Sequence, residues 1–309
     1  SSHLALLIMT IITISSILMV TGGPRSDDPV RIVGIYDENP FPGSGTQEDP
    51  YRIENISIDG TGEGNCLYLE SLQHIMIRNC TFENASGNSD LDHRDTGIFL
   101  KYCGNVTIEN CIVKNCAETG MFLYDSADVN ISDNLFLSNT NDIYCSHSSH
   151  DILIENNEMV ADFGSAIIGY GDNSTITGNT IRNRDNGIQL SGKDNIVIEN
   201  LVENISANGI LAKCRNSLLE DNRIAKSGFT GISLRDASYN LFRGNRVENC
   251  ASYGIDIYVE SFNNSFFENE FINCGFFDME DENNLIPQNN TVNGKPVLRI
   301  DGERNLTIG

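Results

Sequence analysis

The sequence has no tryptophan and only seven prolines, and basic residues are scarce, with 20 Lys and Arg against 43 Asp and Glu. The resulting formal charge of −23 at pH 7 repels nucleic acid and anionic lipid surfaces. We therefore expect no nucleic-acid partner. The same charge suits solubility, cation binding or a saline exterior.

Long apolar runs are also missing, except at the N-terminus, where Leu4 to Val20 carry no charge. This run is long for the core of a signal peptide and short for a membrane span. We interpret residues 1–23 as a signal peptide or membrane anchor, 24–44 as a linker and N-terminal cap, and 45–309 as one folded domain. The sequence therefore predicts export to the periplasm, the cell surface or the exterior, with membrane contact only through this segment.

One eight-residue phrase recurs along the folded domain: apolar, any, apolar, any, any, Asn or Cys, any, apolar. It reads IMIRNCTF from Ile75, VTIENCIV from Val106 and ILIENNEM from Ile152. A second phrase, Gly-apolar-any-apolar, runs in step with it, as in GIFL from Gly97. Short alternating stretches are typical of strands, and a period near 22 residues is typical of a β-solenoid. We predict an all-β, right-handed parallel β-helix of about 9–10 coils of 21–24 residues, preceded by an apolar helix and continuing beyond residue 309.

The sixth position of the phrase predicts a ladder of stacked, inward-facing asparagines, whose amides would bond to one another and satisfy buried polar groups. The predicted ladder consists of Asn134, Asn157, Asn179, Asn222, Asn245 and Asn269. Cys80 and Cys111 take this position in the first coils, and Leu201 interrupts the ladder. We interpret the cysteines as buried thiols acting as small hydrophobes, with a Cys80–Cys111 disulfide as the alternative.

Two segments carry a resemblance to a known family. GTQEDPYRIENISIDG (45–60) resembles the opening of NosD-type β-helix proteins, also described as carbohydrate-binding and sugar-hydrolysis repeats, and NNTVNGKPV (289–297) is similar to the start of a new block in them. The family includes archaeal and bacterial surface proteins and a periplasmic protein that assists copper-centre assembly. The resemblance implies an exported β-helix and supplies no catalytic site.

An insertion in the first coils is the main candidate for catalysis. It concentrates Asp90, Asp92, His93, Arg94 and Asp95 in one loop. In β-helices that act on polysaccharides, such loops overhang a strand face and carry the acid, the base or Ca²⁺ ligands. A solvated charged loop is the alternative interpretation.

Acids before the Gly-apolar phrase suggest a cation site at one edge of the solenoid. Asp95, Glu118 and Asp142 come from consecutive coils, followed by Asp162 and Asp185. Like charges at this spacing would repel, so a bound cation such as Ca²⁺ would stabilise them. The alternative is that the turns spread apart and that their carboxylates stay hydrated without a cation.

An aromatic row is predicted on the outer face of the same strands. In the alternating pattern, Tyr68, Phe99, Phe122 and Tyr144 point outward on adjacent coils. Four exposed rings would form an apolar strip that could stack on sugar rings or contact a partner. Cover by the N-terminal segment or by the insertion is the alternative.

The turn CSHSSH offers a second metal candidate. Cys145, His147 and His150 are residue types that suit copper or zinc. The sequence supplies no visible fourth ligand, and Cys145 could face inward, so a polar turn is the alternative.

Three functions therefore stay open. We favour a non-catalytic surface protein that binds a polysaccharide, another glycan or a surface protein. The second is a polysaccharide lyase, hydrolase or epimerase that uses the Asp90–Asp95 loop. The third is a NosD-like accessory protein that handles copper through the Cys145–His150 turn.

Overall fold

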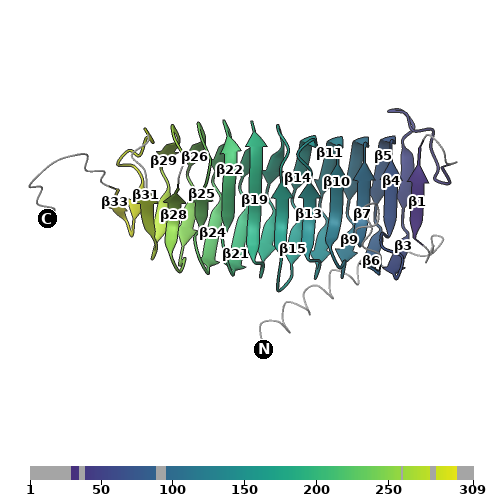
Figure 1. Ribbon diagram of the computed structural model, residues 1–309, viewed down its shortest axis with the longest axis horizontal. Helices are drawn as coiled ribbons and strands as arrows, with labels where there is room; N and C mark the ends of the chain where they lie inside the picture. Colours follow the sequence, from purple (N-terminus) through teal and green to yellow (C-terminus); the bar gives the residue numbers. More distant parts are fainter. Residues whose placement is uncertain (1–28, 35–38, 88–94, 259, 279–282, 298–309) are drawn as a thin grey trace, which may run out of the picture.

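The computed structural model describes residues 29–34, 39–87, 95–258, 260–278 and 283–297. Regular structure in this part is entirely β, and parallel strands from successive turns of the chain build three sheets of a solenoid. Figure 1 shows the strands stacked in chain order along a rod, from β1 to β33. The predicted parallel β-helix is confirmed. The expected N-terminal helix lies outside the described residues, and no helix in the described ranges is long and apolar enough to cross a membrane.

Sheet A has eleven strands, and within a coil its strand comes directly before the strand of sheet B. Its strands are β1 (Val30–Val33), β4 (Leu67–Glu70), β7 (Thr96–Lys101), β10 (Thr119–Tyr124), β13 (Asn141–Cys145), β16 (Ser165–Gly169), β19 (Asn186–Lys193), β22 (Ile210–Arg215), β25 (Ile232–Leu234), β28 (Tyr253–Ile257) and β31 (Gly275–Asp278). Strand β1 comes from the segment predicted as linker and cap, and it pairs in parallel with β4.

Sheet B has ten strands. They are β2 (Tyr51–Glu54), β5 (Gln73–Arg78), β8 (Gly104–Glu109), β11 (Ala127–Ser132), β14 (His150–Glu155), β17 (Thr175–Thr177), β20 (Ile196–Ile198), β23 (Leu218–Glu220), β26 (Leu241–Arg243) and β29 (Ser265–Phe267).

Sheet C has twelve strands. They are β3 (Ser57–Thr61), β6 (Thr81–Ser86), β9 (Ile112–Lys114), β12 (Leu135–Leu137), β15 (Glu158–Val160), β18 (Thr180–Arg182), β21 (Leu201–Ile205), β24 (Arg223–Ser227), β27 (Arg246–Glu248), β30 (Glu270–Ile272), β32 (Thr291–Val292) and β33 (Lys295–Pro296). All pairs are parallel except β32–β33, an antiparallel hairpin that ends the sheet.

The corner between sheets B and C shows why the repeat phrase has its form. From Cys80 to Asn269, the residue before each inward corner residue has a left-handed backbone, as at Asn79 (φ 54°), Asn156 (φ 55°) and Gly178 (φ 64°). Asn, Asp and Gly tolerate this conformation best. The turn directs the next residue into the core, and alternation then buries every second side chain of the following strand.

The asparagine ladder at this corner is confirmed and is longer than the sequence phrase indicated. Each side-chain amide donates to the next Oδ1, as from Asn134 to Asn157 (3.0 Å), and a carbonyl of the coil behind accepts a second bond. The observed ladder runs through Asn134, Asn157, Asn179, Asn200, Asn222, Asn245, Asn269 and Asn290.

The predicted interruption at Leu201 is wrong. Asn200 occupies the corner and donates to Asn222 Oδ1 at 3.0 Å, while Leu201 lies on the outer face in register with Thr180. The repeat phrase had been aligned one residue too late in this coil, where Ile196 pairs with Thr175 and Val197 faces the core. A slip of one residue exchanges the two faces of a strand.

Glycine in the second phrase is explained by contact between coils. A Cβ at Gly187 would lie 2.3 Å from the carbonyl oxygen of Gly209, and one at Gly231 would lie 2.6 Å from that of Gly254. Each of these glycines therefore lets the next coil approach at the start of a sheet A strand.

We predict that Asn200→Ala lowers the free energy of unfolding by about 2–4 kcal/mol. The substitution leaves the buried amide of Asn179 and the carbonyl of Ile176 without their side-chain partner, and each unsatisfied group costs about 1–3 kcal/mol. Urea unfolding followed by circular dichroism measures the change. The neighbouring control is Leu201→Ala, which removes a half-exposed side chain and should lower the free energy of unfolding by less than half as much. A larger loss for Leu201→Ala than for Asn200→Ala would place Leu201 in the ladder.

Candidate functional site

The predicted aromatic row exists on the outer face of sheet A. Tyr68, Phe99, Phe122 and Tyr144 are in register on β4, β7, β10 and β13. Successive ring centroids lie 5.0, 4.9 and 4.9 Å apart, mostly edge to face. The three rings of Tyr68, Phe99 and Phe122 form a buried cluster separate from the main core.

The exposure predicted for this row is wrong for three of its members. Tyr68, Phe99 and Phe122 expose 1–3% of their surface, and Tyr144 is half-buried. The rings pack against one another, and the Arg31 guanidinium lies 4.8 Å from the Tyr68 centroid. The Tyr68 hydroxyl donates to Glu70 at 2.7 Å. Burial is the main cause that raises the pKa of Tyr68, and the hydrogen bond to Glu70 raises it further.

Further aromatic residues extend the row onto the corner between sheets A and B. Tyr124 contacts Phe122, Tyr102 contacts Tyr124, and Tyr170 contacts Tyr144, with centroids 5.6–6.3 Å apart. His147 stacks on Tyr170 at 4.5 Å. We call these eight rings the aromatic array; its members are Tyr68, Phe99, Tyr102, Phe122, Tyr124, Tyr144, His147 and Tyr170.

The solvent-facing part of the aromatic array was not identified from the sequence. Tyr102 is 45% exposed and Tyr124 is 36% exposed, and His147 is also exposed. Tyr102 has a left-handed backbone (φ 54°) directly before the inward Cys103, so its ring points away from the core. The signal was available in the repeat, since a residue before an inward corner residue faces outward.

The predicted column of edge acids is not formed as expected. The pairing of Thr119 with Asn141 puts Glu118 beside Thr140, so Asp142 is two residues out of register with the edge. Glu118 does follow Asp95, whose carbonyl accepts a bond from the Glu118 amide. In the described part of the chain no three His, Cys, Asp or Glu side chains form a metal-binding group.

Asp142 instead faces the interior, where it forms a buried ion pair with Arg184. Both side chains are fully buried, and Asn139 Nδ2 also donates to Asp142 at 3.0 Å. Arg184 donates to the carbonyls of Asn139 and Phe163 at 2.7 and 2.9 Å. Burial raises the pKa of Asp142 to about 6, against the opposing effect of Arg184. The pair is therefore a structural contact between coils.

The CSHSSH turn does not bring its three candidate ligands together. Cys145 faces the core, and burial raises the pKa of its thiol to about 12. His147 stacks on Tyr170, whereas His150 bonds to Asp151 at 2.7 Å. Alternation along β13 explains the outcome, because Cys145 is in register with the inward Leu123.

The candidate catalytic loop is only partly described. Asp90, Asp92, His93 and Arg94 lie outside the described residues, and Asp95 has a left-handed backbone (φ 43°) immediately before β7.

Another acid on the outer face of sheet A was not named as a site residue from the sequence. Asp256 occupies the outward position of β28 in register with Ser233, yet it is fully buried. Thr230 Oγ1 donates to its carboxylate at 2.9 Å, and burial raises the pKa of Asp256.

The fold agrees with the protein families that the sequence matches. Residues 25–204 match the NosD family, described as periplasmic copper-binding protein, and residues 165–308 match the right-handed β-helix region. The chain belongs to the NosD family of right-handed β-helix proteins.

Among curated proteins, the chain is similar to the uncharacterized protein YclG of Bacillus subtilis strain 168, with 23% identity over 273 residues. The match covers 71% of this chain and 45% of YclG, so the chain spans about half the length of that relative.

Three solved structures share the fold at low identity. The mannuronan C-5 epimerase AlgE6 A-module of Azotobacter vinelandii has a TM-score of 0.55 and 15% identity, covering 82% of this chain and 89% of its own. Endo-xylogalacturonan hydrolase of Aspergillus tubingensis has a TM-score of 0.55 and 10% identity, covering 83% and 91%. The Dettilon tailspike protein has a TM-score of 0.58 and 14% identity, covering 82% and 60%. These likenesses establish the fold alone.

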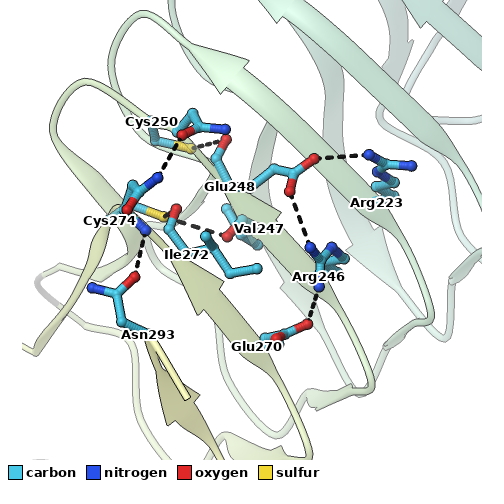
Figure 2. A network of polar contacts seen from close by, with 11 residues as sticks. Arg223, Arg246, Val247, Glu248, Cys250, Glu270, Ile272, Cys274 and Asn293 are labelled. Carbon is cyan, nitrogen blue, oxygen red and sulfur yellow. Dashed lines mark hydrogen bonds and ion pairs between the residues drawn. The ribbon is translucent and has the colours of Figure 1, made fainter. Parts of the chain in front are cut away.

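The described residues do not fit the copper site that the family description implies. Thiolates and imidazoles suit copper, but all nine cysteines are buried free thiols. Burial raises the pKa of Cys66 to about 12 and of Cys103 to about 11. In Figure 2, the Cys274 thiol faces the Val247 carbonyl, to which it donates at 3.4 Å.

We predict that the nine thiols react slowly in the native protein and completely after unfolding. Ellman's reagent added without reductant measures both states, with a reduced and alkylated sample as the control. A titre that is two thiols short in the unfolded sample would reveal a disulfide, and the alternative stated from the sequence places it between Cys80 and Cys111.

We also predict that Arg184→Met destabilises the protein by about 3–5 kcal/mol, because Asp142 stays buried without its cation. The double substitution Arg184→Met with Asp142→Leu should recover most of the loss, since a buried ion pair can be replaced by apolar contacts. Arg182→Met is the matched control, because its partners Glu158 and Glu203 lie with it on the outer face, partly exposed to solvent, where such pairs are worth at most about 1 kcal/mol each. Equal effects of Arg184→Met and Arg182→Met in urea unfolding would contradict the structural role.

Proposed function

We propose that this protein is an exported β-helix that binds a polysaccharide along the aromatic array without catalysing a reaction. The observation that carries the proposal is the continuity of the array, in which ring contacts link buried Tyr68 to exposed Tyr102 and Tyr124. The buried rings fix the exposed rings in place. Fixed aromatic faces bind sugar rings at little cost in side-chain entropy.

The fold relatives support a polysaccharide ligand. The epimerase and the hydrolase named above are enzymes whose names specify polysaccharide substrates, and they use the same solenoid. A long outer face with one residue per coil suits a polymer, because its units can contact successive coils in the same manner. The acidic composition and the family's periplasmic description support export, with residues 1–23 serving as signal peptide or anchor.

We predict that replacing Tyr102 and Tyr124 together by alanine weakens polysaccharide binding about tenfold or more. Two stacked rings at about 0.5–1.5 kcal/mol each give a change of that size. Affinity electrophoresis in gels containing dextran, xylan, alginate or polygalacturonate measures it. The matched control is Phe163→Ala with Phe229→Ala, because both rings are comparably exposed but precede β16 and β25 at the opposite corner.

Two results would contradict the proposal. Equal loss in the control pair would mean that the aromatic array is not the binding surface. Product formation from any of these polysaccharides, abolished by Asp92→Ala, would make the protein an enzyme that uses the insertion loop.

A further inference from the structure

Most cations in the described part of the chain are neutralised by neighbouring carboxylates. On sheet C, Glu248 accepts from Arg223 at 2.9 Å and from Arg246 at 3.2 Å, and Arg246 also pairs with Glu270 (Figure 2). Such pairing is expected where acids outnumber bases by 43 to 20. A cluster of cations without carboxylate partners is therefore distinctive in this protein.

Lys213, Arg215 and Arg235 form such a cluster. Among the described residues, none of the three has a carboxylate oxygen within 4.0 Å of its charged nitrogens. All three side chains are exposed, and they alternate with the buried Ala212, Cys214 and Leu234. We call them the cationic strip.

Two members of the cationic strip, Lys213 and Arg235, continue the outward row that carries Tyr124 and Tyr170. Residue-by-residue pairing of sheet A places Tyr124, Ser146, Tyr170, Ser191, Lys213 and Arg235 at one outward position of consecutive coils. Five coil steps separate Tyr124 from Arg235, or roughly 24 Å at about 4.8 Å per step. A polymer lying along this row would meet tyrosines first and cations next.

Aromatic rings accompany the cations. The Arg215 guanidinium lies 5.5 Å from the Tyr239 centroid, and that of Arg235 lies 5.1 Å from Tyr258. Tyr239 is 52% exposed. Guanidinium groups held on rings keep their hydrogen-bond donors directed outward while losing little rotamer entropy on binding.

Nearby acids reduce the charge of this region without neutralising the strip. Asp194 accepts from Asn216 at 2.5 Å, and Asp236 is exposed next to Arg235. Burial raises the pKa of Asp256, and the charge of Arg235 opposes that rise. At about 0.15 M salt the screening length is about 8 Å, so most of the net charge of −23 is screened from a ligand at the strip. Lys213 and Arg235, on adjacent coils, act within that distance.

We propose that the cationic strip binds the acid groups of an anionic polysaccharide, either carboxylates or phosphates, that lies along the row shared with Tyr124. This inference rests on the proposed function and names its substrate class. The tyrosines contact the sugar faces, and Lys213, Arg215 and Arg235 contact the acid groups. The selectivity for acidic over neutral polymers then resides in the strip.

The test compares polygalacturonate with its fully methyl-esterified form, which keeps the backbone and removes the charge. The wild type should bind polygalacturonate more tightly, and Lys213→Gln with Arg235→Gln should weaken that binding about tenfold, as expected for two exposed ion pairs. Binding to the ester should not change. Lys226→Gln with Lys295→Gln is the control, because it changes the net charge equally at exposed sites elsewhere.

A wall teichoic acid, whose acid groups are phosphates, separates the two sources of negative charge. If the wild type binds teichoic acid but not polygalacturonate, and the strip variant binds teichoic acid more weakly, the cationic strip recognises phosphates. Two results would contradict the proposal that the cationic strip binds acid groups: wild-type protein that binds polygalacturonate and its ester equally, or a control variant that loses as much binding as the strip variant. Either result leaves the proposed function intact. Failure of every polysaccharide, acidic and neutral, overturns the proposed function and this inference with it.

Discussion

The fold depends on the hydrogen bonds that join each corner residue to the same corner of the next coil. At the corner between sheets B and C, each ladder asparagine after Asn134 accepts from the preceding asparagine, Asn134 accepts from the Cys111 amide, and each of them donates to a backbone carbonyl. Asn240 and Asn264 repeat this arrangement at the corner between sheets A and B. A buried amide has few other ways to satisfy its polar atoms, so these bonds fix the register of one coil on the next.

Fixed register explains how much of the fold could be predicted. A period near 22 residues and the Asn-or-Cys position were sufficient to predict a parallel β-helix and most of the ladder, because every coil repeats one solution to the same packing problem. The error at Leu201 arose because apolar residues alone define the phrase only to within one residue. In most coils an Asn, Asp or Gly before the corner marks its position, but in that coil the left-handed residue is Glu199 (φ 55°), whose type does not indicate this conformation.

The candidate sites were harder to predict, because a site depends on which face each residue takes and on contacts between distant coils. Asp142 was assigned to an edge, but a shift of two residues places it inside, where Arg184 pairs with it from 42 residues further along the chain. Asp142 replaces the glycine of the second phrase, opposite Gly120, and Arg184 lies outside both phrases, so periodicity carries no information about their contact. Tyr102 and Tyr124 were overlooked for a related reason, since the outward positions considered were limited to the middle of each strand.

The division between inward and outward positions also bears on function. Inward corner residues and alternate strand residues form the core of the coil stack, whereas the outward rows change in residue type from coil to coil, from the packed rings of Tyr68, Phe99 and Phe122 to the exposed side chains of Lys213 and Arg235. In the row from Tyr124 to Arg235, tyrosine and serine alternate over four coils and cations follow in the next two, while the strands keep the same pairing. A ligand along such a row is recognised by the order of its residues. One solenoid can therefore acquire selectivity for a polymer without any change in its core, and in this chain the change from tyrosine to lysine and arginine lies along a single row.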